Sequence, residues 1–465
     1  MQVKTYTNSF YWSFLILVAC NFCSCRRFLE VPPAPEQQTA QGLFSNNQSA
    51  ETAVAGIYSE MVTRPNQLTA GYVSLYGALA ADEYYYFTPG LMDEFSTNEL
   101  SELNHGSLQV LFWQPAYRFI HAANMCMEQL EKSEHVSSVT KRKLLGEVKV
   151  LRAFQYYLLS SFFGAIPLSL TSSYAKNATE GRVPYGLVLE QIKKDLEEAI
   201  ALLDGVEVSG GKGRVNKGVA IALLVKLAAL EKDWETVQRL VTELEASGGY
   251  QLMPKLDDVF LKNSPEAIWQ LYTVQQQLNT YEGNIILPLN EQTTPTYLLT
   301  NWLVASFEEG DLRKQHWIKQ RQFAGATLYY PYKFKVRGGT GTYPELECNT
   351  PLRYADMLLL RAEAAIHLGD LSGGLADLNA VRVRAGLAAI ESGEAEELLE
   401  AVFNERRWEL FGEWGNRWFD LKRTGRVDGV MSNLKPATWQ STDQLWPIPI
   451  AELKLNPNLT QNEGY

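Results

Sequence analysis

The sequence predicts a mainly α protein, built as a tetratricopeptide-like helical-repeat superhelix with a long loop-rich insertion that carries minor β-structure. Residues 354–386 read as a helix hairpin, because Leu358, Ala362 and Ile366 share one face at a spacing of about 3.6 residues. The stretch 216–246 repeats the same pattern of small and large apolar residues. Hairpins of about 34 residues that recur along a chain are typical of helical-repeat stacks.

Length and composition limit the possible classes of protein. With 465 residues, the chain is long for a single core, which agrees with an extended stack. The net charge is −11, and no run of Lys or Arg forms a basic patch in the sequence, so we expect no nucleic-acid partner. Two cysteines of the body, Cys126 and Cys348, are interpreted as small buried residues.

The N-terminus has the pattern of an exported lipoprotein. An apolar run from Phe10 to Ala19 follows Lys4 and is too short to span a bilayer, which is typical of a signal peptide. The run ends in a sequence similar to a bacterial lipobox at Cys20, and Cys25 is a second candidate for lipidation. No later stretch reaches about 18 consecutive apolar residues. We therefore predict a protein that is tethered to a membrane without crossing it.

These patterns predict how the chain is divided into segments. Residues 1–25 form the signal peptide and lipidation region, and 26–48 form an extended Pro-rich tether. Residues 49–465 form one domain, with helical repeats over about 49–249 and 351–425, a loop-rich insertion over about 250–350, and a closing segment over 426–465.

Individual helices are predicted from apolar periodicity and from breakers. The first should begin near Ser49, followed by loop-rich residues 71–105. The next run, 108–132, contains Pro115, which should kink the helix or mark its true start. A long helix over 141–163 should end at Gly164 and pair with a helix after Pro184; within the insertion, AIWQLYTV and TLYYPYKFKV are the β-prone pieces.

Five blocks in order along the chain resemble the SusD/RagB family of outer-membrane nutrient-binding lipoproteins. They start at Cys25-Arg-Arg-Phe-Leu-Glu and end in the closing sequence QNEGY. The matching positions between them are Arg152, Ala153, Gly164, Pro167, Asp356, Leu360, Ala362, Glu363, Asn379, Arg382, Arg384, Gly386, Glu405, Arg406, Glu409, Leu410, Arg417, Trp418, Asp420, Leu421, Pro447, Pro449, Glu452, Asn456 and Pro457. Two features depart from the family pattern: its register favours Cys25 over the better lipobox at Cys20, and GEWGN interrupts the segment over 412–416.

The resemblance implies a surface lipoprotein of the outer membrane, anchored in its lipid. Such proteins lie over a SusC-like TonB-dependent transporter and capture glycans or, in some members, peptides for it. They have no catalytic activity, and no cofactor is implied.

The block 405–425 combines several carboxylates and arginines, so a catalytic cluster must be weighed against a structural network. Glu405 and Glu409 share a helix face at i,i+4, and arginine suits partly buried bidentate ion pairs. We therefore interpret the block as a structural clasp. The five histidines are scattered without metal-ligand spacing, and we expect no metal.

Aromatic residues in the predicted loops are the candidates for binding a ligand. The run DEYYYF places several rings in succession, and they cannot all point inward. Exposed rings can stack on the apolar face of a sugar while neighbouring polar groups bind its hydroxyls. The alternative is that these rings pack against the helices. The candidates are Asp82, Tyr84, Tyr85, Tyr86, Tyr281, Asn290, Trp302 and Trp439.

Three functions remain open from the sequence. The preferred one is a non-enzymatic protein that captures oligosaccharide, or peptide, for a partner transporter. The second is a lipid-anchored helical scaffold that binds proteins only. The third, a surface glycoside hydrolase, would need two carboxylates about 5–10 Å apart across a cleft.

Overall fold

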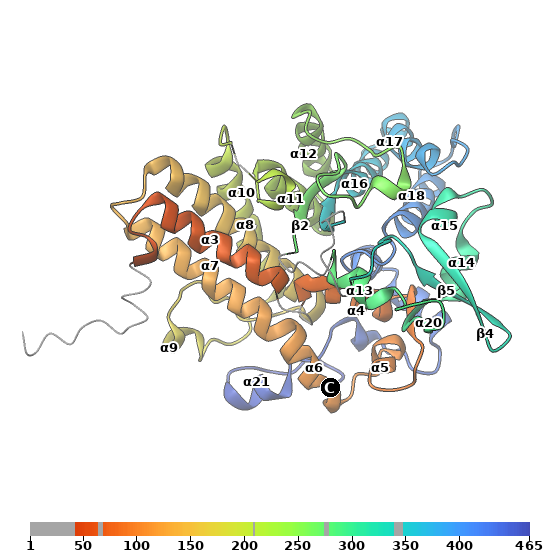
Figure 1. Cartoon of the computed structure of the whole chain (residues 1–465), viewed down its shortest axis with the longest axis horizontal. Helices are drawn as coiled ribbons and strands as arrows, with labels where there is room; N and C mark the ends of the chain where they lie inside the picture. Colours follow the sequence, from red (N-terminus) through yellow and green to blue (C-terminus); the bar gives the residue numbers. More distant parts are fainter. Residues whose placement is uncertain (1–41, 64–67, 208–209, 274–278, 339–346) are drawn as a thin grey trace, which may run out of the picture.

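The computed structural model describes residues 42–63, 68–207, 210–273, 279–338 and 347–465 (Figure 1). Residues 1–25, with Cys20 and Cys25, and most of the predicted 26–48 tether lie outside this described part. Among the described helices, none is both long and apolar enough to cross a bilayer.

The N-terminal half is helical, as predicted. The long helices α7 and α10 both pack against α8, and α3 contacts α7 and α8. The helices of this half are α3 (Asn47–Thr63), α4 (Val73–Ala80), α5 (Asp93–Thr97), α6 (Glu102–Leu108), α7 (Gln114–Lys132), α8 (Ser138–Phe163), α9 (Tyr174–Asn177), α10 (Tyr185–Leu203), α11 (Lys217–Glu231) and α12 (Trp234–Ala246). Short π or 3-10 turns cover Leu68–Tyr72, Gln109–Trp113, Gly211–Gly213, Leu256–Asp258 and Ser441–Gln444.

The two predicted hairpins are confirmed. Helix α11 pairs with α12, helix α16 pairs with α17, and α12 packs against α16, so the two hairpins stack on each other. The C-terminal helices are α16 (Tyr354–His367), α17 (Leu371–Arg384), α18 (Ala395–Leu410), α19 (Asn416–Arg423), α20 (Val427–Leu434) and α21 (Ile450–Leu455). The mainly helical, tetratricopeptide-like fold class is therefore confirmed.

Several predicted boundaries need correction. The helix expected near Ser49 begins at Asn47. The backbone N–H of Ser49 donates to the side-chain oxygen of Asn46 at 2.9 Å, so Asn46 is the residue that caps the helix. Residues 73–80 form the fully buried helix α4 and not a loop. The segment lacked polar–apolar alternation because every face of that helix is covered. The expectation for Pro115 is correct, since it lies in the first turn of α7.

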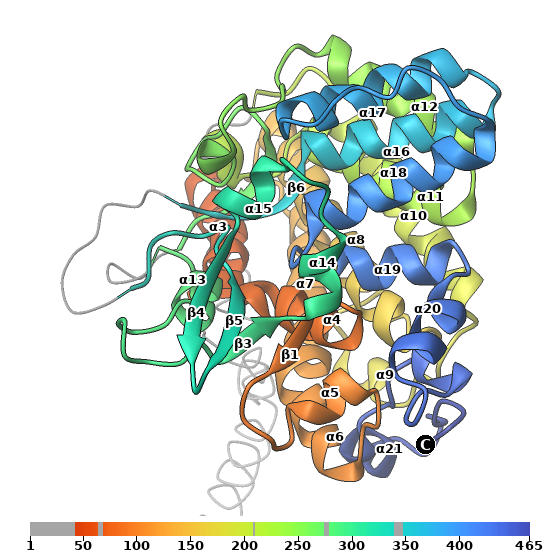
Figure 2. The same cartoon turned by 90° about the vertical axis from the view of Figure 1, so that its right-hand side faces the viewer.

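The insertion carries short antiparallel strands, as expected, and one of them pairs with a strand of the segment 71–105. Strand β1 (Tyr84–Tyr86) pairs with β3 (Tyr297–Leu299), β2 (Ala267–Leu271) with β6 (Asn349–Arg353), and β4 (Ile318–Phe323) with β5 (Ala326–Pro331). Helices α13 (Tyr281–Ile286), α14 (Asn301–Ser306) and α15 (Leu312–His316) lie between the strands. Figure 2 shows β1, β3, β4 and β5 together on one side of the molecule, with the hairpin helices on the other.

A buried ion network joins the insertion to the C-terminal helices. Arg313 and Arg353 both bind Glu409, at 3.1 and 2.6 Å, and Arg353 also binds Glu266 at 2.7 Å. The members of this buried ion network are Glu266, Arg313, Lys333, Arg353, Arg382, Arg384, Glu405, Glu409 and Glu413, all of them at most 8 % exposed. The structural interpretation of the block 405–425 is therefore confirmed.

The closing segment ties the C-terminus to the first repeats. The side-chain amide of Asn462 donates to the carbonyl oxygens of Phe163, at 3.0 Å, and of Trp446, at 2.7 Å. Arg182 donates to the carbonyl of Thr460 at 2.9 Å. Because the bonds to Phe163 and from Arg182 join residues nearly 300 positions apart, the last residues are part of the fold.

Candidate ligand-binding groove

The aromatic run after Asp82 forms an edge strand that begins in the interior and continues at the surface. Tyr84 is buried, whereas Tyr85 and Tyr86 are partly exposed. Tyr86 makes an edge-to-face contact with Tyr297, its partner across β1 and β3, at a centroid distance of 5.3 Å. The run thus presents two of its three tyrosines, Tyr85 and Tyr86, at the surface.

Asp82 and Tyr84 lie inside the protein, which argues against direct ligand contact for either of them. The carboxylate of Asp82 binds the guanidinium of Arg417 at 2.8 Å and that of Arg407 at 3.1 Å. Although burial opposes ionisation, these two arginines lower the pKa of Asp82 to about 2. The Tyr84 hydroxyl lies against Gly412, where a Cβ atom would be 1.9 Å from it, so the GEWGN turn needs glycine there.

The remaining candidates from the sequence also include both buried and exposed residues. Tyr281 is buried, and its hydroxyl donates to the carbonyl of Thr63 at 2.9 Å. Trp439 is half-buried, packs edge-on against Trp418 and donates to Asp428 at 3.1 Å. Trp302 is 55 % exposed on α14, directly after β3. Asn290 is exposed in the loop after α13, where its side chain accepts the N–H groups of residues 292 and 293.

An open groove of about 840 Å³ lies between this loop and the β4–β5 hairpin. It is lined by Leu287, Pro288, Asn290, Glu291, Lys314, Gln315, Ile318, Lys319, Gln320, Arg321, Tyr329, Tyr330, Tyr332, Lys335 and Arg337. Arg321 donates to the carbonyl of Thr293 at 2.5 Å, which fixes the loop to the hairpin. The volume is in the range of sites for small organic ligands.

Tyrosines and basic side chains alternate along the hairpin wall of the groove. Lys319 pairs with Tyr330 across the two strands, and Arg321 follows Lys319 on the same face of β4. The ring of Tyr332 lies 4.0 Å from the ammonium of Lys319 and 4.5 Å from that of Lys335. Burial lowers the pKa of Lys335, whose ammonium binds Asp257 at 3.1 Å.

The hairpin also meets the aromatic strand predicted from the sequence. Strands β3 and β5 lie side by side, and the ring of Phe87, just after β1, packs edge-on against Phe323 at the end of β4. Phe323 itself is 44 % exposed. The structure therefore brings the surface of β1 and β3 next to the hairpin that forms the groove.

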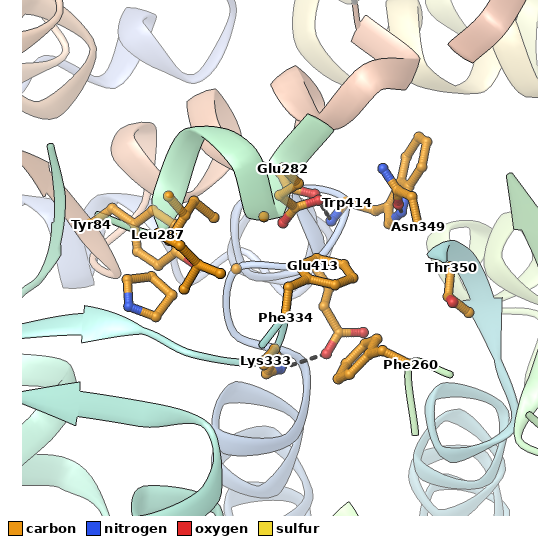
Figure 3. A pocket seen from close by; sticks show the side chains of 15 residues that line it. Tyr84, Phe260, Glu282, Leu287, Lys333, Phe334, Asn349, Thr350, Glu413 and Trp414 are labelled. Atoms are coloured by element: carbon orange, nitrogen blue, oxygen red, sulfur yellow. Dashed lines mark hydrogen bonds and ion pairs between the residues drawn. The ribbon is translucent and has the colours of Figure 1, made fainter. Parts of the chain in front are cut away.

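Two further hollows differ from the groove in size and lining. Figure 3 shows an interior cavity between Tyr84, Glu282, Lys333 and Glu413, but its volume is about 20 Å³, room for about one water molecule and not for a sugar. A second open hollow of about 1200 Å³ lies beside α7 and begins at Gly42, the first described residue. Its lining residues include one tyrosine, Tyr174, whereas the groove has three.

The described residues offer no metal centre, since none of their His, Cys, Asp and Glu side chains form a group of three or more that could hold an ion. Several of the buried carboxylates, among them Glu405 and Glu409, bind arginines. Burial raises the pKa of Glu409. The guanidinium groups of Arg384, Arg353 and Arg313 lower it by more, so the pKa lies below its ordinary value.

Sequence reasoning missed the hairpin residues of the groove. The sequence shows no basic run, yet the structure gathers five cations there: Lys314, Lys319, Arg321, Lys335 and Arg337. Alternate residues of a strand share a face, so the spacing of basic and aromatic residues in IKQRQ and LYYPYKFKVR was the available signal.

The fold and the groove define a helical-repeat protein with an inserted, ligand-sized surface site. Comparison with known families is consistent with this class. Residues 312–465 match the model described as the SusD family, and residues 27–228 match the model described as "Starch-binding associating with outer membrane". The chain belongs to the SusD/RagB family.

Characterised relatives extend over nearly the whole chain. SusD-like protein P25 of Formosa agariphila is 24% identical over 95% of this chain and 97% of its own length. A laminarin-binding SusD-like protein has the same fold, with a TM-score of 0.76 and 23% identity over 91% of this chain and all of that one. Surface glycan-binding protein A from Bacteroides thetaiotaomicron, solved with laminarihexaose, gives a TM-score of 0.74 and 21% identity over 89% of this chain and 99% of that one.

Proposed function

We propose that this protein captures oligosaccharides in the groove and delivers them to a SusC-like TonB-dependent transporter in the outer membrane. The observation that carries the proposal is the groove itself, an open hollow of about 840 Å³ with three tyrosines and several polar side chains on its walls. Rings of this kind stack on the C–H faces of sugars, and the polar groups bind hydroxyls. Two proteins of the same fold are described as binding laminarin or laminarihexaose.

The protein is proposed to bind without catalysis. Hydrolysis of a glycosidic bond needs a pair of carboxylates about 5–10 Å apart across the substrate. The groove has a single carboxylate among its lining residues, that of Glu291. The buried carboxylates Glu405 and Glu409 are bound to arginines within the buried ion network. Incubation of the pure protein with oligosaccharides should therefore leave their chain lengths unchanged.

Anchoring at the cell surface is the second part of the proposal. Cys20 and Cys25 are the candidate lipidation sites, joined to the domain by the 26–48 tether, and the matched model describes its members as associating with the outer membrane. Labelling cells with an alkyne fatty acid should mark the wild-type protein. Of the variants Cys20→Ala and Cys25→Ala, one should lose the label, and labelling of both would contradict anchoring through a single cysteine.

In this proposal the predicted parts of the domain have different roles. Helical repeats over about 49–249 and 351–425 form the scaffold, and the insertion over about 250–350 carries the groove. A glycan microarray probed with the pure protein tests capture, and detergent pull-down from the native membrane tests partnership. We expect binding to a defined group of glycans and recovery of a TonB-dependent barrel.

The outcomes separate the alternatives. Recovery of a barrel with binding to peptides but no glycan would favour a peptide-capturing member of the same system. Binding of proteins alone, with neither glycan nor barrel, would favour a helical scaffold and contradict the proposal.

A further inference from the structure

The groove differs from the rest of the molecule in its charge. The chain has a net charge of −11, yet the groove is lined by five cationic side chains and the single carboxylate of Glu291. Like charges that gather in one hollow repel one another and raise the local positive potential. The groove is thus a basic hollow on an acidic protein.

Four of the five cations have no carboxylate partner among the described residues: Lys314, Lys319, Arg321 and Arg337. Arg321 and Arg337 donate to backbone carbonyls, Arg321 to that of Thr293 and Arg337 to those of Asn284 and Leu287. Carbonyl groups satisfy N–H donors but do not neutralise the guanidinium charge. Lys314 and Lys319 are both exposed at the groove.

The contrast with other cations of the fold is informative. Arg152, Arg353 and Arg417 each lie within 2.8 Å of a carboxylate oxygen. These three arginines of the described part of the chain are thus neutralised by carboxylates of the protein, unlike the four cations of the groove named above. Those in the groove are left for a counter-charge from outside.

The ring of Tyr332 contacts two of the groove cations, Lys319 and Lys335. Its ring lies between 4.0 and 4.5 Å from the ammonium groups of Lys319 and Lys335, an attractive arrangement that holds each cation over an aromatic face. Tyr330 lies beside Lys319 across the two strands. Aromatic faces for sugar rings and cations for acidic groups therefore lie side by side on one wall.

We propose that the groove selects anionic oligosaccharides, whose rings carry carboxylate or sulfate groups. This inference rests on the proposed function, and adds the class of glycan. Lysine ammonium groups act as point charges toward an acidic substituent, and Arg321 can offer two parallel N–H donors to a planar carboxylate or to a sulfate. The three tyrosines contact the uncharged faces of the same sugars.

The test uses pairs of probes with the same sugar backbone, one neutral and one acidic. Dextran is compared with dextran sulfate, and fully methyl-esterified polygalacturonate with its de-esterified form, by affinity electrophoresis and calorimetry at two salt concentrations. Poly-glutamate serves as an anionic chain without sugar rings. We expect at least one acidic glycan to bind about tenfold tighter than its neutral partner and to weaken as salt rises. The sulfated and carboxylated arms show which acid is preferred.

Matched variants locate the effect. The double variant Lys314→Gln/Lys319→Gln should lose about tenfold in affinity for the acidic glycan, because each exposed charge pair accounts for about a threefold share of the affinity. The control Lys194→Gln/Lys454→Gln changes net charge equally at exposed lysines of α10 and α21, outside the groove. The control should retain wild-type affinity, and thermal unfolding should show that both double variants are folded.

Each other outcome has a distinct meaning. Equal or tighter binding of the neutral probes overturns the inference and leaves the proposed function intact. Equal losses in both double variants, or poly-glutamate binding as tight as that of the acidic glycans, also overturn the inference. Failure of any glycan to bind, on the array or in these assays, overturns the proposed function together with the inference.

Discussion

Two regions of this protein, the buried ion network and the groove, contain many charged side chains. They differ in how those charges are paired. In the network Arg353 contacts the carboxylates of Glu266, Glu409 and Glu413 within 2.7 Å, and it is 2 % exposed. In the groove, Lys319 is exposed and its close neighbour is an aromatic ring. Charges of the network are thus paired within the protein, whereas four of the five groove cations have no carboxylate partner among the described residues.

The largest expected effect is on the network. Arg353→Met leaves three buried carboxylates without a cation they share, and removal of one partner from a buried ion pair typically costs about 3–5 kcal/mol. Chemical denaturation should show this loss. The matched change Arg239→Met, at an exposed arginine of α12, should alter stability by less than about 0.5 kcal/mol. Equal small effects of both variants would contradict a structural role for the network.

The next effect depends on pH. The pKa of Asp82 falls from its ordinary 3.8 to about 2 in the folded protein, so its ion pair stabilises the fold above pH 4 and loses that effect as pH falls from about 4 to about 2. Asp82→Asn should cost about 2–3 kcal/mol at pH 7. The difference from wild type should shrink across that acidic window. With Glu391→Gln, an exposed carboxylate, no such pH-dependent difference should be seen.

A smaller effect, on binding alone, is expected in the groove. Tyr330→Ala removes a ring beside Lys319 and should weaken glycan binding by about 3- to 10-fold, as for a central aromatic contact. Because Tyr330 is partly exposed, its loss should leave thermal stability nearly unchanged. Tyr174→Ala, at an exposed tyrosine of α9 outside the groove, is the control. Loss of binding in the control as well would argue for a different site.

The smallest effect concerns a residue singled out by the sequence. Trp302 is 55 % exposed on α14 next to β3, so Trp302→Ala should change the free energy of unfolding by less than about 0.5 kcal/mol. We expect a loss of glycan affinity of about threefold or less, because Trp302 is not among the residues that line the groove. A loss as large as that of Tyr330→Ala would extend the site to α14.

The comparison also shows what the sequence could predict. The two hairpins, the end of α8 at Gly164 and the structural character of Glu405 and Glu409 followed from periodicity, glycine and i,i+4 spacing. These signals are local, and the structure confirms them. Helix α4 was missed because a helix buried on every face has no amphipathic pattern.

The site was harder to predict because it depends on distant contacts. Aromatic runs were the signal used, but Tyr84 and Tyr281 turned out to be buried, and Asp82 is bound by arginines more than 300 residues away. The groove forms where the loop after α13 meets the β4–β5 hairpin, and no single stretch of sequence contains both walls. Pairing of charges across such distances can be recognised only in the folded chain.

Hydrogen exchange with and without a bound glycan tests the central claim most directly. A glycan selected on the array should slow amide exchange in residues 287–293 and 318–332, the two walls of the groove, and should leave the helices of the buried ion network unchanged. Protection confined to other surfaces, with none in the β4–β5 hairpin, would contradict the assignment of the groove as the binding site.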